Sequence, residues 1–125
     1  MRTSVLIADG EEKTRFILRT ALENVGYTVC GEAANGYDTV DKATELAPDV
    51  IVLELRMPML NGIEVASVLR QRLPRSKIIL VSTYNVGESL VGVWGISAIV
   101  AKTEGLWKVV DSVRRLARLA PAAAD

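Results

Sequence analysis

The chain has 125 residues, half of them hydrophobic, and 15 basic side chains balance 15 acidic ones. This length suits one domain that buries roughly two-thirds of the surface exposed by the unfolded chain, so folding requires neither a metal nor a disulfide. The balanced charge argues against a domain that grips nucleic acid or an anionic membrane by itself, and we expect neither as a partner. No apolar run approaches the roughly 20 residues of a membrane-spanning helix, which predicts a soluble, cytoplasmic chain.

Two residue types limit the chemistry that this chain can perform. Histidine is absent and Cys30 is the single cysteine. Imidazole-based catalysis, histidine metal sites and an internal disulfide are therefore excluded. Any chemistry has to rest on carboxylates, hydroxyls, amines and backbone groups.

The first half of the sequence alternates short apolar runs with helical spacing, which predicts strands joined by helices. The expected elements are a strand over 4–8, a helix over 11–25, a weaker edge strand over 27–33 and a helix over 36–47. The run 50–53 is mostly β-branched and ends in Glu54, which suits a strand buried on both faces of a parallel sheet. Ligands gather at the carboxyl ends of such strands, so Glu54 is a candidate functional residue; the alternative is a strand that simply ends in a solvated glutamate.

The second half continues the alternation. Asn61 and Glu64 have the spacing of a capping box, so we expect a helix to begin there. The apolar runs 77–82 and 96–101 predict two more buried strands. The last helix carries a hydrophobic stripe formed by Leu106, Val109, Val110, Val113 and Leu116.

The segment between the last two strands is a weak helix former. Gly87 and Gly92 each cost a helix about 1 kcal/mol relative to alanine. We therefore expect only a short helix over about 88–93.

Five strands that alternate with five helices predict an α/β fold, a flavodoxin-like doubly wound five-stranded parallel sheet of order 2-1-3-4-5 with helices on both faces. In that order, four strands deliver polar side chains to one edge of the sheet: Asp9, Glu54, Ser82 and Lys102. Two acids, a hydroxyl and an amine would meet where the strand order reverses. This convergence is the main functional signal in the sequence.

In the order and spacing of these residues, the sequence resembles the receiver domain of two-component response regulators. The resemblance runs from Val5 to about Leu119, and the segments that carry it are Val5-Leu6-Ile7-Ala8-Asp9, Pro48-Asp49-Val50, Met57-Pro58 with Gly62, Ser82 and Lys102. We accordingly expect residues 1–120 to form a receiver domain and residues 121–125 to be a tail or the start of a linker.

The resemblance implies a phosphorylation site. In that family a histidine kinase's phosphoryl group passes to an aspartate at the end of the third strand, with Mg²⁺ and an amine to neutralise the charge in flight. By position, Glu54 is the phosphoacceptor equivalent, Lys102 the amine and Ser82 the hydroxyl. The metal ligands would be Asp9, Glu54 and the backbone carbonyl of Arg56.

The sequence departs from the family pattern at three positions: the phosphoacceptor, the second acid after the first strand, and the switch aromatic of the fifth strand. Glu54 replaces the aspartate, and its extra methylene moves the carboxylate roughly 1–1.5 Å further into the pocket. Gly10 stands where the family has a second acid, and we expect Glu11, one position on, to point out of the pocket rather than to replace it. The switch aromatic of the fifth strand is here Ile99.

These departures lead to the hypothesis of an atypical receiver domain that is not an enzyme, is not phosphorylated on aspartate and acts by protein–protein interaction. We expect no cofactor and at most weak binding of Mg²⁺. One alternative is a working receiver that takes a phosphoryl group on Glu54 or a nearby side chain. Another is a flavodoxin-like nucleotide-binding enzyme, although the acids in Asp9-Gly10-Glu11-Glu12 disfavour a phosphate loop there.

The sequence also suggests partners, without naming one. The resemblance implies a sensor histidine kinase or an output domain, or a homodimer through the face formed by segment 88–93, strand 96–101 and the last helix. Trp94 is a candidate contact on that face, whereas we expect Trp107 to be buried or half-buried. Whether Glu54 would hold an active-like or an inert conformation is left open.

Overall fold

The central sheet has the strand order that the sequence predicts. The computed structural model describes residues 2–83 and 90–119. All strand pairs are parallel and the order is β2-β1-β3-β4-β5. The strands are β1 (Ser4–Ala8), β2 (Thr28–Ala33), β3 (Val50–Glu54), β4 (Lys77–Ser82) and β5 (Ile96–Ala101).

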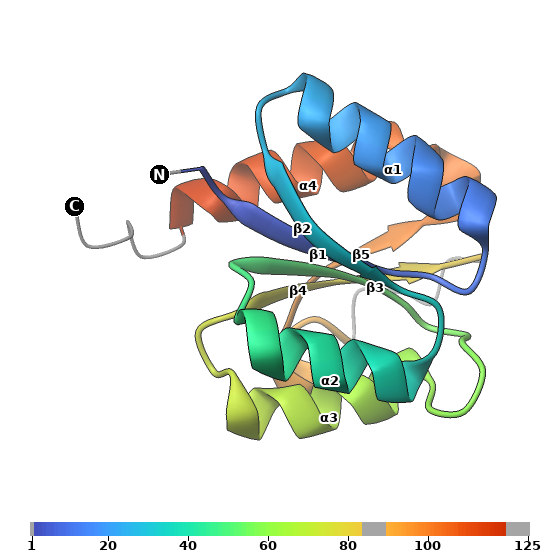
Figure 1. The fold of residues 1–125 in the computed structure, drawn as a ribbon, viewed down its shortest axis with the longest axis vertical. Helices are drawn as coiled ribbons and strands as arrows, with labels where there is room; N and C mark the ends of the chain where they lie inside the picture. Colours follow the sequence, from blue (N-terminus) through green and yellow to red (C-terminus); the bar gives the residue numbers. More distant parts are fainter. Residues whose placement is uncertain (1, 84–89, 120–125) are drawn as a thin grey trace.

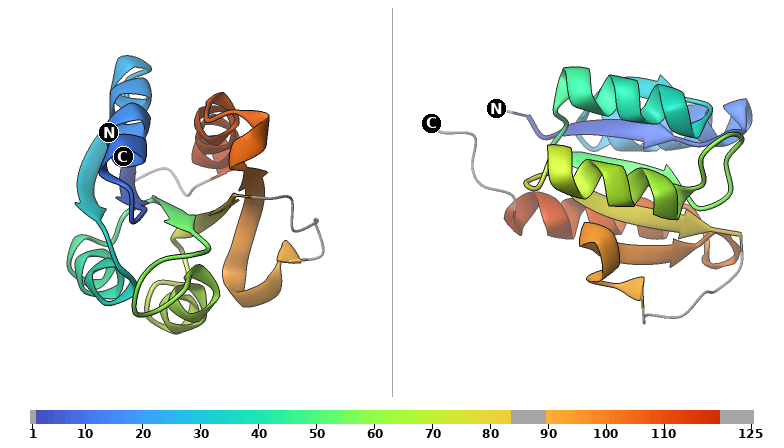
Figure 2. Two further views of the ribbon diagram at one scale, coloured as in Figure 1. Left: turned by 90° about the vertical axis from the view of Figure 1, so that its right-hand side faces the viewer. Right: turned by 90° about the horizontal axis from the view of Figure 1, so that it is seen from below.

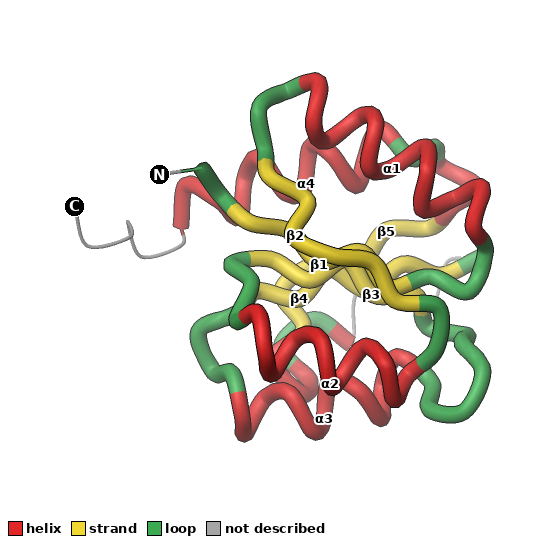
Figure 3. The backbone as a smooth tube through the Cα atoms, viewed as in Figure 1, coloured by secondary structure: helices red, strands yellow, loops and turns green. Residues whose placement is uncertain are grey.

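Four α-helices among the described residues cover the sheet in two layers. α1 (Glu12–Asn24) and α4 (Trp107–Leu119) lie on one face, and α2 (Gly36–Leu46) and α3 (Gly62–Arg72) lie on the other (Figure 1). Figure 2 shows the two helix pairs on either side of the sheet, and Figure 3 shows the strands between them. In this part of the chain, no helix has the length and apolar character needed to cross a membrane.

Each face of the sheet has its own hydrophobic core because side chains alternate along a strand. In β1, Val5 and Ile7 pack with Leu18 and Leu22 of α1. On the other face, Leu6 packs in a second cluster, which includes buried residues of α2 and α3. The central strands are thus buried on both sides, as their continuous apolar runs indicate.

The start of α3 is fixed by the expected capping box. The Asn61 side chain accepts from the Glu64 N–H at 2.9 Å, and the Glu64 carboxylate accepts from the Asn61 N–H at 3.0 Å. The next residue, Gly62, lets the helix approach β3 closely, because a Cβ there would lie 2.5 Å from the carbonyl oxygen of Glu54. This close approach positions the loop that follows β3.

Two expectations need correction or restriction. Residues 88 and 89 of the helix expected over 88–93 lie outside the described residues. The rest does not form an α-helix: residues 90–95 form turns and a 3₁₀ helix, η2 (Val93–Gly95), with positive φ at Gly92 and Gly95. The prediction that Trp107 is buried is wrong, since it is 63% exposed. One residue along a helix is a turn of 100°, so Trp107 leaves the buried stripe that includes Val109.

Candidate functional site

Three of the four predicted side chains at the carboxyl edge of the sheet meet in one ionic cluster. Lys102, directly after β5, places its Nζ 2.6 Å from Glu54 Oε2 and 3.0 Å from Asp9 Oδ2. The Asp9 side chain is only 2% exposed, that of Glu54 12% and that of Lys102 21%. A single ammonium therefore bridges two largely buried carboxylates from adjacent strands.

Backbone amides occupy the other oxygen of each acid. The Gly10 N–H donates to Glu54 Oε1 at 3.1 Å, and the Glu11 N–H donates to Asp9 Oδ1 at 2.9 Å. The Glu11 carboxylate instead accepts from the Thr14 hydroxyl, and Glu11 is exposed. The Glu11 carboxylate is therefore directed to the first turn of α1 and does not supply the missing acid.

The pKa values of Lys102 and Asp9 both depart from their ordinary values. Burial acts to lower the pKa of Lys102, but its hydrogen bonds to Glu54 and Asp9 outweigh burial and the pKa is raised. Burial raises the pKa of Asp9, against the hydrogen bonds from the Glu11 amide and Lys102. The two carboxylates thus favour the charged form of Lys102.

The carboxylate oxygens that a Mg²⁺ ion would use are already engaged in this structure. All four carboxylate oxygens of Asp9 and Glu54 already accept from Lys102 or from backbone N–H groups. Residues 2–83 and 90–119 contain no group of three acidic or other ligand side chains that could hold a metal. Mg²⁺ binding depends on carboxylates that can turn toward the ion, and here both are engaged by a competing cation.

The remaining predicted residues are Ser82, Ile99 and Arg56. Ser82 is 5% exposed at the end of β4, next to Ala101 of β5 in the sheet register. Ile99 pairs in register with Leu80 and packs partly buried against the core on the α2–α3 face. The side chain of Arg56 is exposed, two residues past Glu54.

Sequence reasoning missed an arginine clamp beside the cluster. Arg15 and Arg19 of α1 bind the carboxylate of Glu32 at 3.1 and 2.6 Å, and Arg15 Nη1 also donates to the Asp9 carbonyl at 2.8 Å. The signal was the i, i+4 spacing of the two arginines, which puts them on one helix face. Only the fold reveals that Glu32 of β2 faces them.

Comparison with known proteins decides the family. The model of the response regulator receiver domain matches residues 5–114. The chain belongs to this family. The receiver domain therefore accounts for the parallel sheet and for the acids and the lysine at its carboxyl edge.

Individual relatives agree with this assignment. The chain is 38% identical over 82 residues to the chemotaxis protein CheY of Thermotoga maritima, covering 66% of this chain and 68% of that protein. It is 28% identical over 118 residues to the response regulator protein VraR of Staphylococcus epidermidis, covering 92% of this chain but only 56% of VraR. The receiver domain thus spans little more than half the length of VraR.

A solved structure shows the same fold. The response regulator TrrA of Thermotoga maritima, crystallised in complex with Mg²⁺–BeF, superposes with a TM-score of 0.81 at 28% identity. The match covers 91% of this chain and 98% of TrrA.

Proposed function

We propose that this chain is an atypical receiver domain of two-component signal transduction, which acts through protein–protein contacts without phosphorylation on residue 54. The observation that carries the proposal is the ionic cluster, in which Lys102 bridges Asp9 and Glu54. The lysine that should meet an incoming phosphoryl group is bound at 2.6 Å to the side chain that should accept it.

The geometry at Glu54 opposes acceptance. Its longer side chain carries the carboxylate past the end of β3 to the Gly10 amide and the Lys102 ammonium. Attack on a phosphoryl group needs a free carboxylate oxygen held in line, and a misplacement of about 1 Å can cost a factor of about a hundred in rate. Releasing either oxygen of Glu54 breaks the hydrogen bond that it accepts, from the Gly10 N–H or from Lys102, and this adds to the cost.

The metal requirement opposes it as well. Phosphoryl transfer in such sites relies on a divalent cation to neutralise charge, and TrrA, with the same fold, is solved with Mg²⁺–BeF. We propose that Mg²⁺ binds weakly here if it binds at all, because Lys102 supplies the positive charge between Asp9 and Glu54. The space at Gly10 is not the obstacle: a Cβ there would make only ordinary contacts, the nearest at 3.5 Å.

Signal readout would also differ from the family pattern. Ile99 has no hydroxyl and is already packed against the core on the α2–α3 face. An aromatic residue that swings inward after phosphorylation is therefore missing from β5. We infer that the partner is a sensor histidine kinase, an output domain or a second copy, and that it recognises a surface that does not change shape on phosphorylation. We also infer that the domain works in the cytoplasm without enzymatic activity.

Intact mass measurement after incubation with acetyl phosphate and Mg²⁺ tests the proposal. We expect the mass to stay unchanged, because the carboxylate oxygens of Asp9 and Glu54 are all engaged by Lys102 or by backbone N–H groups. A stoichiometric gain of one phosphate that is stable in acid and labile in base would overturn it. The Glu54→Gln variant, treated alongside, would then show whether residue 54 or a neighbouring side chain carries the phosphate.

The visible absorption spectrum of the purified chain tests the alternative of a flavin-binding enzyme. We expect no absorption at wavelengths longer than the band of the protein itself. A yellow protein would instead support a flavodoxin-like enzyme.

A further inference from the structure

One short stretch of the chain, from the end of α3 to the start of β4, carries only positive charge. Four basic residues lie within it: Arg70, Arg72, Arg75 and Lys77. Residues 65–87 contain neither aspartate nor glutamate. The negative end of the helix dipole accounts for the two arginines in the last turn of α3, but not for Arg75 and Lys77, which follow the helix.

The basic cluster formed by these four residues has no acidic partner within residues 2–83 and 90–119. Its three arginines are exposed and its lysine is partly exposed. Elsewhere in the fold, Arg15, Arg19 and Lys102 instead pair with carboxylates. Unpaired like charges close together repel one another, and an acidic molecule bound to them would remove that repulsion.

The basic cluster flanks a groove of about 320 Å³ between the end of α3 and the turn around η2, the α3–η2 groove. Leu73, Pro74 and Ile78 supply its apolar lining, and Gly92 and Gly95 line it without side chains. A Cβ on Gly92 would meet no atom within 4 Å, so the groove is open at that point. Its volume is at the lower end of the range for ligand sites and suits one inserted side chain.

Arg70 joins the groove to the basic cluster. It lines the groove, and its stem lies beside Gly95, where a Cβ would be 3.8 Å from Arg70 Cγ. The hydroxyl of Ser76, which also lines the groove, is already used, because it donates to the Pro48 carbonyl at 2.6 Å. The guanidinium of Arg70 is thus the charged group nearest the apolar lining, and a guanidinium can bind a carboxylate through two parallel hydrogen bonds.

We propose that the α3–η2 groove and the basic cluster bind an acidic peptide segment of a partner protein, with one apolar side chain of that segment in the groove. The inference rests on the proposed function, since it names the chemistry of the partner in a protein–protein contact. An acidic segment fits because the apolar groove and the unpaired cations lie side by side, so a single peptide satisfies both.

A nucleic acid fits this surface less well than a peptide does. Single-stranded nucleic acids bind where aromatic side chains stack on the bases, and Leu73, Pro74 and Ile78 offer no aromatic ring. The whole chain has zero net charge, which disfavours binding driven by release of counterions. The observations therefore favour a protein partner.

The α3–η2 groove lies at the opposite edge of the sheet from the ionic cluster. Ile78, which lines the groove, is the second residue of β4 and pairs with Ile96, the first residue of β5. Glu54 is instead the last residue of β3, and Lys102 follows the end of β5. A peptide in the groove therefore leaves the contacts of Lys102 untouched, and its binding requires no phosphoryl group.

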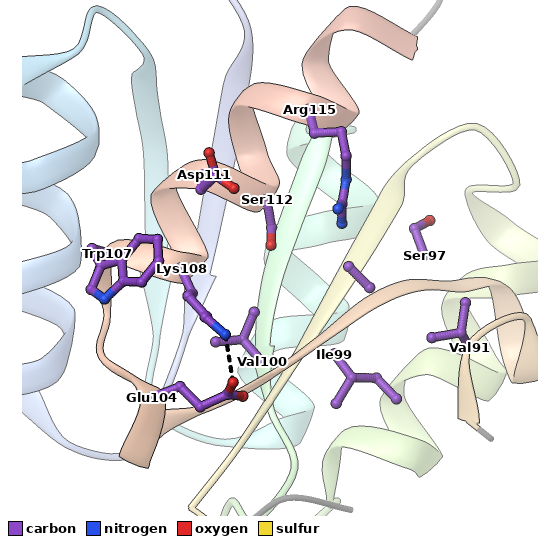
Figure 4. A pocket seen from close by; sticks show the side chains of 11 residues that line it. Val91, Ser97, Ile99, Val100, Glu104, Trp107, Lys108, Asp111, Ser112 and Arg115 are labelled. Carbon is purple, nitrogen blue, oxygen red and sulfur yellow. Dashed lines mark hydrogen bonds and ion pairs between the residues drawn. The ribbon is translucent and has the colours of Figure 1, made fainter. Parts of the chain in front are cut away.

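Figure 4 shows a second hollow, over β5 and α4, that lacks this one-sided charge. Lys108 is bound there to Glu104, and Asp111 lies on the same helix as Arg115. Acids and bases thus surround that hollow together, whereas the α3–η2 groove is flanked by bases alone. An acidic segment is accordingly directed to the groove.

Fluorescence anisotropy with labelled synthetic peptides tests the proposal. The probes are short peptides of aspartate and glutamate with leucine, phenylalanine or serine at the centre, and matching peptides with lysine in place of the acids. We expect the acidic leucine or phenylalanine peptide to bind, and the serine peptide to bind roughly tenfold more weakly or less, because it places no apolar side chain in the groove. The lysine peptides do not bind.

Charge-reversal variants locate the peptide on the chain. We expect Arg72→Glu and Arg75→Glu each to weaken binding of every acidic probe roughly tenfold or more. Arg114→Glu is the matched control: it reverses an exposed arginine without an ion pair in the described residues, on α4 across the sheet, and leaves binding unchanged (Figure 1). Circular dichroism verifies that each variant is folded.

A variant of the groove separates the apolar contact from the charge. Pro74→Ser removes part of the apolar lining at an exposed position, so it weakens the leucine and phenylalanine probes and leaves the serine probe unchanged. Equal binding of the serine and leucine probes, equal loss in Arg114→Glu and Arg72→Glu, or no binding of any acidic probe overturns the proposal. So does tighter binding of an oligothymidylate or of phosphatidylserine vesicles, which would assign the cluster to a nucleic acid or a membrane.

The peptide experiment and the phosphorylation experiment can fail independently. The anisotropy measurement contains no phosphoryl donor, so a lack of peptide binding would leave the conclusion on Glu54 as it is. A phosphorylated wild type would overturn the proposed function and leave a measured peptide site standing.

Discussion

At the scale of single residues, Lys102 is the centre of the site. Its ammonium neutralises two carboxylates that would otherwise repel each other in a poorly solvated position. Breaking a buried ion pair by removing one partner costs more than the pair itself contributes, because the remaining charge is left without compensation. Lys102 therefore has a structural role in this domain that needs no phosphoryl group.

The variant Lys102→Met measures this role. We expect the free energy of unfolding to fall by about 2–3 kcal/mol, at the lower end for buried pairs because Lys102 keeps some solvent contact. Lys108→Met, which removes an exposed lysine from an i, i+4 pair, is the control and has a much smaller effect. Urea unfolding gives the free energy of unfolding of both variants. An equal loss of stability in the two would show that the ionic cluster contributes no more than an exposed ion pair.

The sequence predicted which side chains meet but not how they bond. Asp9 and Lys102 directly follow strands and Glu54 is the last residue of one, so the strand order alone brings the three together. The bond from the Gly10 N–H to Glu54 depends on backbone orientation in the first loop, which residue types do not encode. Trp107 was assigned to the wrong environment because its neighbour Leu106, and not Trp107, belongs to the buried stripe.

At the scale of elements, the start of α3 supports the strand that carries Glu54. The Asn61–Glu64 capping box fixes the first turn, and the Gly62 N–H donates to the Leu55 carbonyl at 2.7 Å. The start of α3 and the end of β3 are therefore joined directly through the backbone.

Loss of the cap should destabilise that unit measurably. We expect Asn61→Ala to lower the free energy of unfolding by about 1 kcal/mol, because the Glu64 N–H loses its acceptor. Asn24→Ala is the matched control, because Asn24 is exposed at the end of α1 and forms no capping box. Urea unfolding measures the free energy of unfolding of both variants. An Asn61→Ala protein as stable as the wild type would show that the cap contributes nothing.

The edge strand β2 depends on the arginine clamp in a pH-dependent way. Burial acts to raise the pKa of Glu32, but the hydrogen bonds from Arg19 and Arg15 outweigh it and the pKa lies below its ordinary value. A depressed carboxyl pKa stabilises the fold above the unfolded-state value of 4.5 and ceases to do so as the pH falls through the folded value.

Comparison of wild type with Glu32→Gln over a pH series tests this contribution. We expect the wild type to be the more stable at neutral pH and the difference in free energy of unfolding to shrink as the pH drops below 4.5. A difference that is the same at acidic and neutral pH would mean that the charge of Glu32 does not matter.

At the scale of the whole molecule, the sheet order followed from hydrophobic pattern and connection length. Continuous apolar runs identified the central strands, and parallel strands joined by right-handed crossovers leave few topologies. The connection between β4 and β5 was harder, because glycines there remove the periodic signal: Gly92 and Gly95 adopt positive φ around a short 3₁₀ helix. The Glu32 clamp could not be predicted, since it joins two elements only after they fold.

We propose that Glu54 and Gly10 together keep the site from accepting a phosphoryl group. Gly10→Asp restores a second acid where there is room for a side chain, and Glu54→Asp shortens the side chain that now reaches Lys102. The direct measurement is the intact mass of the wild type and of the Gly10→Asp/Glu54→Asp double variant after the same treatment with acetyl phosphate and Mg²⁺. We expect a phosphorylated double variant and an unmodified wild type; a wild type phosphorylated as fully as the double variant would show that Glu54 and Gly10 do not block the reaction.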